Sequence, residues 1–178
     1  AARLWAQTQA GEDPAAMVPA DSRLYVRVEG AGTLHAMWEK DPLLAALRKS
    51  LKAPPAPRAW SQVQELMSMP ARELLERYLG RTAALAGGFG KQRGNVMILS
   101  RVEKSDWEIV PQRLRLLPAE KIGPFDSWTT DDGKGLLAWD GAWLVVSDSR
   151  KAQALRPILE RGGADPPLRD DEEFRRFT

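Results

Sequence analysis

The stretch "TTDDGKGLLAWDGAWLVV", residues 129–146, decides the fold because it places two Asp-Gly pairs between apolar runs. An Asp-Gly pair tolerates the positive φ angles that a two-residue hairpin turn requires. With turn centres at Asp132-Gly133 and Asp140-Gly141, the spacing predicts a meander of antiparallel strands. The predicted strands cover residues 122–130, 135–139 and 142–147.

The strands of this meander are apolar on both faces. A sheet that packs on one side only alternates apolar with polar residues along each strand. Here both alternating sets are apolar, so we expect both faces to be at least partly covered. The two sets are Leu137, Trp139 and Leu144 on one face and Leu136, Trp143 and Val145 on the other.

Upstream of the meander, the stretch "GGFGKQRGNV", residues 87–96, lies between two apolar segments. A phosphate-binding Walker loop needs a Ser or Thr after its Gly-Lys pair and a helix behind it, and neither follows Lys91. The dinucleotide pattern needs a third glycine at position 93, which is Arg. We therefore predict a hairpin, with strands over residues 82–89 and 95–102. The alternative is a weak phosphate loop made of Gly88, Gly90, Lys91 and Arg93.

Another strand comes earlier, where "RLYVRV" sets Leu24, Val26 and Val28 on one side and charged or aromatic residues on the other. This alternation predicts a half-buried strand. Helical spacing and capping residues predict helices elsewhere, including one with Asp106 as its cap, one kinked or broken into two pieces at Pro157 and one capped by Asp170. The predicted fold class is α+β, an antiparallel sheet of a hairpin plus a three-stranded meander, with helices packed on it. The predicted helices cover residues 33–51 in two pieces, 60–67, 70–79, 106–117, 149–163 and a last segment from 171.

A chain of 178 residues suits one domain. Residues 1–20 contain Gly11, Pro14 and Pro19 and no sustained periodicity, so we expect a tether or linker there. Residues 21–178 are then a single α+β domain. The last helix has a start and no finish, and short isolated helices are marginal in water, so we expect this domain to be the N-terminal part of a longer protein.

Composition excludes several kinds of partner and chemistry. Lys and Arg total 26 against 24 Asp and Glu, interspersed along the chain, whereas nucleic-acid binding needs clustered basic residues. The absence of cysteine rules out disulfides and thiol chemistry within this chain. No apolar run approaches the ~20 residues that span a bilayer. We therefore expect no nucleic-acid partner, and a membrane association only through an anchor upstream of this sequence.

Catalytic and metal-binding constellations are not evident in the sequence. The single histidine, His35, lies among residues at helical core spacing and has no identifiable Ser or Asp partner. The acidic pair Asp131-Asp132 suits a turn, and the acidic residues after Asp170 suit a helix start. We expect no catalytic residue, no metal site and no cofactor, and we do not expect an enzyme.

Seven tryptophans could instead serve an interface, since aromatic residues are enriched there. Core packing explains those at helical spacing, such as Trp107. The candidate interface residues are the tryptophans of the meander, Trp128, Trp139 and Trp143.

Four segments carry a resemblance to a known family. They are "VPADSRLYVRV", "ELLERYLGRTAALAGGFG", "GAWLVVSDSRKAQALRPIL" and "PLRDDEEFRRF", which together span most of residues 18–177. Their order resembles a bacterial family of unknown function, domain of unknown function 3352. The resemblance implies an extracytoplasmic domain of the periplasm or cell envelope, often tethered by an N-terminal membrane segment and followed by a second half. It supplies no catalytic residues.

Two functions remain open from the sequence. The first is a noncatalytic extracytoplasmic interaction or scaffold domain, whose partner is another protein or the second half of its own chain. The second is a small-ligand-binding module or an enzyme with a pocket near the Gly87–Gly94 loop or the three meander tryptophans.

Overall fold

A computed structural model describes residues 13–31, 58–90, 95–149 and 152–176. The predicted helices over residues 33–51, His35, and the loop residues Lys91 and Arg93 lie outside these ranges. The strands are β1 (Leu24–Glu29), β2 (Thr82–Gly87), β3 (Val96–Arg101), β4 (Leu117–Pro118), β5 (Asp126–Thr129), β6 (Gly135–Trp139) and β7 (Trp143–Asp148). The helices are η1 (Pro14–Ala16), α4 (Arg58–Met67), α5 (Ala71–Tyr78), α6 (Lys104–Trp107), α7 (Val110–Arg113), α8 (Ala152–Arg161), η3 (Leu168–Asp170) and α9 (Glu172–Arg175).

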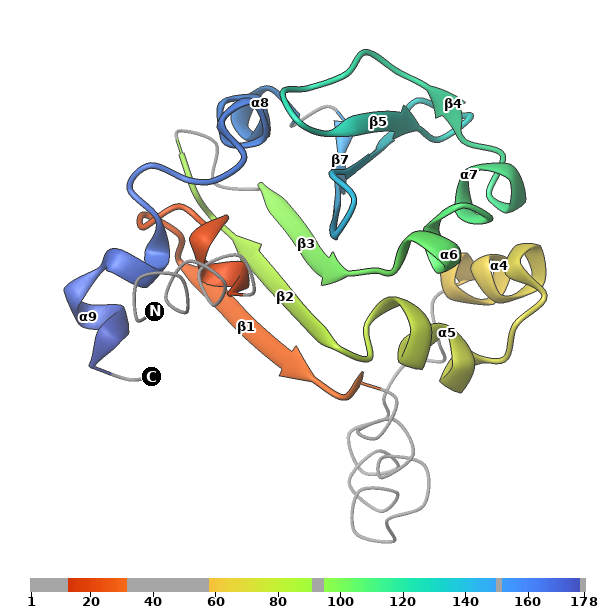
Figure 1. Ribbon diagram of the computed structural model, residues 1–178, viewed down its shortest axis with the longest axis horizontal. Coiled ribbons are helices and arrows are strands. Elements are labelled where there is room, and N and C mark those ends of the chain that lie inside the picture. Colours follow the sequence, from red (N-terminus) through yellow and green to blue (C-terminus); the bar gives the residue numbers. More distant parts are fainter. Residues whose placement is uncertain (1–12, 32–57, 91–94, 150–151, 177–178) are drawn as a thin grey trace, which may run out of the picture.

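The strands form one antiparallel sheet in the order β1-β2-β3-β7-β6-β5-β4 (Figure 1). The predicted hairpin supplies β2 and β3, and the predicted meander supplies β5, β6 and β7. After β3 the chain builds α6, α7 and the far edge of the sheet before β7 returns to pair with β3. The predicted fold class, α+β with an antiparallel sheet and packed helices, is confirmed.

Both predicted Asp-Gly turns form, although with different loop lengths. Gly133 and Gly141 adopt φ angles of 67° and 106°. In the first loop the Thr130 N–H donates to the Gly135 carbonyl at 3.1 Å, so the connection is longer than the two residues we expected. In the second the Asp140 N–H donates to the Trp143 carbonyl at 3.3 Å, so the two loop residues are Gly141 and Ala142, one position later than predicted.

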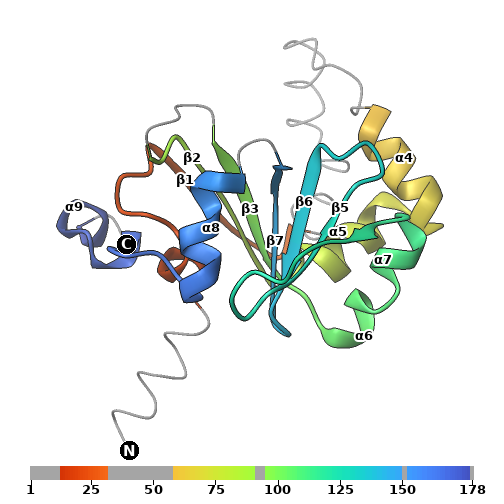
Figure 2. The same ribbon diagram turned by 90° about the horizontal axis from the view of Figure 1, so that it is seen from above.

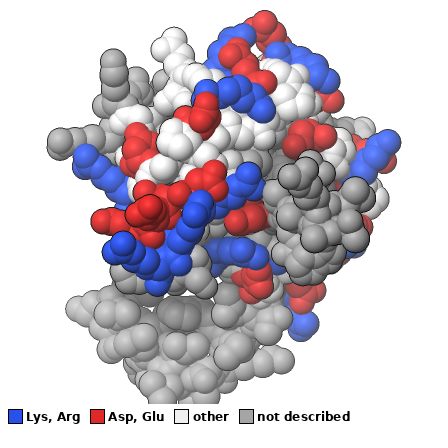
Figure 3. Space-filling view, turned by 60° about the vertical axis from the view of Figure 1, so that its left-hand side comes forward, with Lys and Arg blue, Asp and Glu red and all other residues white. Residues whose placement is uncertain are grey.

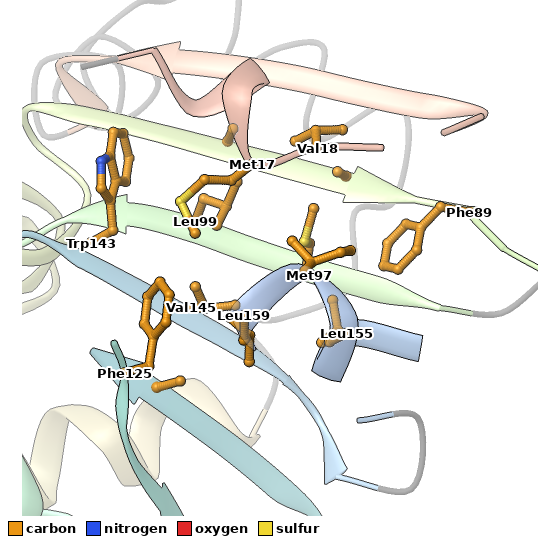
Figure 4. Packing of buried hydrophobic residues seen from close by; sticks show 14 of the residues in the cluster. Met17, Val18, Phe89, Met97, Leu99, Phe125, Trp143, Val145, Leu155 and Leu159 are labelled. Atoms are coloured by element: carbon orange, nitrogen blue, oxygen red, sulfur yellow. The ribbon is translucent and has the colours of Figure 1, made fainter. Parts of the chain in front are cut away.

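Helices cover the sheet from opposite sides, with α8 and α9 on one side of the central strands and α4 to α7 on the other (Figure 2). The core under α8 includes Leu155 and Leu159 of the helix and Leu99 and Val145 of the sheet, all 0–1% exposed (Figure 4). The core under α4 to α7 contains Met67, Leu74, Val102, Trp107, Val110, Leu116, Leu137 and Leu144. The meander therefore has both faces covered, as its two apolar sets predict.

Residues 13–20, which we expected in the tether, belong to the folded body. Ala15 and Val18 are 1% and 0% exposed, and Val18 lies in the core under α8. The Leu168 N–H donates to the Val18 carbonyl at 2.6 Å, which ties this segment to η3. Proline in this segment sets up the short helix η1, capped by the Asp13 side chain, instead of breaking the fold.

The segment after β3 contains two short helices rather than the single one that we predicted. Helix α6 ends at Trp107, and α7 begins at Val110 with Pro111 in its first turn. Proline has no N–H to continue the earlier helix but fits the first turn of a new one. Asp106 lies inside α6, so it is not the cap that the sequence suggested.

Two further helix predictions differ from the structure. Helix α8 is not broken into two pieces at Pro157, because Leu155, Ile158 and Leu159 hold it in the core despite the lost hydrogen bond. The cap of α9 is Asp171, whose Oδ1 accepts from the Phe174 N–H at 2.9 Å, while Asp170 ends η3. The predicted cap at Asp170 was therefore one residue early.

Candidate interaction surface

One half of the sheet exposes apolar side chains on the face that α4 to α7 cover in the other half. We call this surface the open face and define it by its exposed residues Leu24 and Val26 of β1 and Val96 and Ile98 of β3. Their exposed fractions are 46%, 44%, 46% and 39%. Leu85 of β2 lies between Val26 and Ile98 in the strand register and is half-buried.

The register shows that the open face is continuous with the α4 to α7 core. A transverse row of directly paired residues crosses six of the seven strands, from β1 to β5. In this row the side chains point to one face, because directly paired residues of an antiparallel sheet share a face. The row runs Val26, Leu85, Ile98, Val146, Leu137 and Trp128. Its exposure falls from 44% at Val26 to 7% at Leu137, where the helices begin to cover it.

Gly87 shapes the open face between Leu24 and Val96, its two partners in the register. It contributes no side chain there, and a Cβ atom at Gly87 would lie 3.1 Å from the Asn95 carbonyl oxygen. That spacing is tight for a methyl group. Leu24 and Val96 thus flank a strip of bare backbone, which leaves both side chains accessible.

The alternation of β1 was predicted correctly, but its apolar side is not the buried one. We expected Leu24 and Val26 to supply the packed half of this strand. Instead Tyr25 packs against the core under α8, with its ring centroid 5.4 Å from that of Phe174. Burial, with a contribution from the carboxylate of Asp13, raises the pKa of Tyr25 from 10.0 to about 12.

The phosphate-loop alternative meets a competing contact. Gly88 and Gly90 adopt φ angles of 73° and 66°, as a turn requires. The Gly90 N–H, which a bound phosphate would need, donates to Asp21 Oδ2 at 2.8 Å. A carboxylate of the chain therefore already occupies this amide, and a phosphate beside it would face like-charge repulsion. Lys91 and Arg93 lie outside the described residues.

The three candidate tryptophans of the meander do not form one cluster. Trp143 lies in the core under α8 and is 6% exposed (Figure 4). Trp128 and Trp139 lie on the opposite face, where their rings contact Trp107 at centroid distances of 5.0 and 5.7 Å. The grouping was wrong because side chains alternate between faces: Trp139 pairs with Leu144, which puts Trp143 on the other side.

The charged side chains are of mixed sign and exposed. Figure 3 shows Lys and Arg interspersed with Asp and Glu on one face of the molecule, without a basic patch. Examples are Arg27 with Asp13 at 3.6 Å, Arg77 with Glu73 at 2.8 Å, and the close pair of Arg81 and Glu103. Exposed pairs of this kind contribute little to stability. Among the described residues no group of three or more His, Asp or Glu side chains is placed to hold a metal ion.

The comparisons with known proteins identify no relative. No family model matches the chain. No curated protein matches it significantly. No solved structure does so either. In the part of the chain that the structure describes, no helix is both long and apolar enough to cross a membrane.

Sequence reasoning missed the open face. The signal was present in "VMILSR" of β3, where Val96 and Ile98 alternate with Met97 and Leu99 and both sets are apolar. The pattern indicates two apolar faces on β3, as in the meander, but it does not show whether a face is covered. Met97 and Leu99 are buried under α8, and the other set lies on the open face.

Proposed function

We propose that this chain is a noncatalytic extracytoplasmic domain that binds protein through its open face, as an interaction or scaffold element of the cell envelope. The observation that carries the proposal is the row from Val26 to Ile98, a continuous aliphatic strip of a hydrogen-bonded sheet in which Val26 and Ile98 are exposed and Leu85 between them is half-buried. Contiguous exposed apolar surface on a soluble fold is typical of protein contact sites. Single exposed leucines would not support this.

The surroundings of the open face also favour protein over small ligands. Its side chains are aliphatic and sit on regular strands, so they form a broad surface rather than a set of convergent polar groups. The hairpin loop beside it has its Gly90 amide engaged by Asp21. Both features suit a partner that presents its own apolar surface and excludes water from these side chains.

The extracytoplasmic location rests on two sequence features. The chain has no cysteine, so an oxidising compartment poses no risk of wrong disulfides. The four segments that resemble the bacterial family of unknown function point to the same location. The partner is then another envelope protein, or further chain of the same protein.

Site-specific crosslinking tests this proposal. A photoreactive amino acid at Ile98 should capture a defined protein in envelope extracts of the native host, while the same group at Gln153 should not. Gln153 is a matched control because it is exposed on α8, on the opposite side of the sheet. Equal and diffuse labelling from both positions would contradict binding through the open face.

A further inference from the structure

Strand β1 forms one edge of the sheet, and its outer backbone groups can be identified from the ladder. The Gly88 N–H donates to the Asn95 carbonyl at 2.9 Å, in the same register as the other β2–β3 pairs. Hydrogen-bonding direction alternates along an antiparallel strand. The backbone groups of Gly87, Leu85 and Ala83 in β2 therefore hydrogen-bond to β1. Their partners in β1, which are Leu24, Val26 and Val28, direct their own N–H and C=O groups back to β2. The N–H and C=O groups of Tyr25, Arg27 and Glu29 point outward.

The two edges of the sheet differ in how they resist further pairing. The far edge is β4, which has two residues, one of them Pro118. A short strand with a proline is a common protection against edge-to-edge contact. β1 has six residues and no proline, and within the described ranges no strand pairs with its outer side. It therefore offers a complete ladder for another strand.

We propose that β1 pairs antiparallel with β1 of a second copy of this chain, across a twofold axis at Val26, so that the two sheets become one. This inference rests on the proposed function, because it names a second copy of the chain as the partner of the edge that adjoins the open face. Each Tyr25 then exchanges backbone hydrogen bonds with Arg27 of the other copy. β-strand addition of this kind is a recurring mode of protein recognition.

The backbone of β1 allows several registers for pairing with a second copy, and the side chains favour the one with Val26 on the axis. Outward-pointing residues must oppose one another, which permits Arg27 to face Tyr25, Arg27 or Glu29 of the second copy. Arg27 facing Arg27 places like charges opposite each other. Arg27 facing Glu29 shortens the overlap to the end of the strand and leaves Leu24 unpaired. With Val26 on the axis, residues 24–28 of the two copies overlap and Arg27 faces Tyr25, which carries no charge. The overlap ends there because the Arg23 N–H already donates to the Gly87 carbonyl at 3.0 Å and Glu29 pairs with Arg27 of its own chain.

This register also extends the open face. Leu24 of one copy lies opposite Val28 of the other, and the two Val26 side chains meet at the axis. All of these side chains are on the face that exposes Leu24 and Val26. The dimer thus places two open faces side by side and buries the apolar parts of β1 against each other. The driving force is the removal of these aliphatic groups from water.

The first experiment removes one outward donor. The full chain should sediment at twice the mass of one chain over a concentration series, and Arg27→Pro should sediment as a single chain. Proline at position 27 deletes an N–H that β2 does not use, so the β1–β2 ladder remains. Arg27→Ala keeps that N–H and should remain a dimer. Loss of the dimer in both variants, or in neither, would contradict backbone pairing at this edge.

A single introduced cysteine tests the register. The chain has no cysteine of its own, so Val26→Cys should link two copies through a disulfide under mild oxidation, because the two residues at position 26 meet at the axis. Leu24→Cys should not link the copies, because position 24 faces position 28 of the other copy. Equal linkage from both variants, or linkage from Leu24→Cys alone, would overturn this register.

The same samples separate this inference from the proposed function. A wild-type chain that sediments only as a single chain overturns the dimer. If that single chain still crosslinks a defined partner from Ile98 and not from Gln153, the open face remains a protein-binding surface. If neither assembly nor position-specific crosslinking occurs, both proposals fail.

Discussion

Ile98 and Leu137 lie in the same transverse row of the sheet, separated only by Val146, and yet they have different surroundings. Ile98 is 39% exposed on the open face, whereas Leu137 is 7% exposed in the core under α4 to α7. Their strands are equally regular and their side chains equally apolar. The difference arises from the helices, which the chain places over one half of the face. A strand pattern therefore identifies an apolar face but does not determine what covers it.

Among substitutions that shorten a side chain, the largest effect should come from the covered half. Leu137→Ala should lower the free energy of unfolding by about 3–5 kcal/mol, because it removes buried methyl groups and leaves a cavity beside Leu144. Ile98→Ala should cost roughly 1–2 kcal/mol, since much of its side chain already contacts water. Urea denaturation measures both. Equal costs for the two substitutions would show that the two halves of the face are equally covered.

Substitution by lysine should have different effects on stability at the two faces of β3. Ile98→Lys should change the free energy of unfolding by less than about 1 kcal/mol, because the lysine stem can lie along the open face while its ammonium reaches water. Leu99→Lys, one residue later, should prevent folding, since Leu99 is 0% exposed in the core under α8. Circular dichroism and thermal unfolding provide the measurement. A folded Leu99→Lys variant, or an unfolded Ile98→Lys variant, would reverse the assignment of the two faces.

A substitution in the turn between β6 and β7 should have a smaller effect on the free energy of unfolding, although this turn determines which residues of the two strands the helices cover. Asp140 Oδ1 accepts hydrogen bonds from the N–H groups of Ala142 and Trp143 at 2.9 and 2.7 Å. Asp140→Ala should lower the free energy of unfolding by about 1 kcal/mol, because both donors then lose this partner. Asp140→Asn retains an acceptor and is the control. Thermal unfolding of the two variants should differ, and identical melting curves would count against a role for this carboxylate.

The sequence predicted the local features of the fold better than their assembly. Asp-Gly turns and period-2 alternation depend on neighbouring residues, so β5, β6 and β7 could be located before the structure. The burial of Val18 under η3 depends on residues that are 150 positions apart in the chain, Val18 and Leu168, and no local pattern reports it. The open face was missed for the same reason. Its exposure is set by which residues pack over it and not by the strands themselves.

The smallest effect concerns the pKa of Asp132 in the loop between β5 and β6. This pKa shows whether the hydrogen bonds of that loop persist when packing under the helices is lost. The Thr130 hydroxyl donates to Asp132 Oδ1 at 2.7 Å, and with the Lys134 N–H it lowers the pKa of this carboxyl from 3.8 to about 2. A lowered folded-state pKa contributes stability above the ordinary value, and this contribution disappears as the pH falls from about 4 toward 2. The carboxyl is fully exposed, so the contribution is small.

NMR titration of the Asp132 side chain should therefore have its midpoint near 2 in the wild-type chain and closer to 3.8 in Thr130→Val, which lacks the donor. In Leu137→Ala the midpoint should stay near 2, because the turn is held by hydrogen bonds among residues 130–135 rather than by the helices. A midpoint that rises in Leu137→Ala would show that the helices over the covered half also hold the β5–β6 ladder in place. The covered half would then differ from the open half in the strands themselves, and not only in what packs on them.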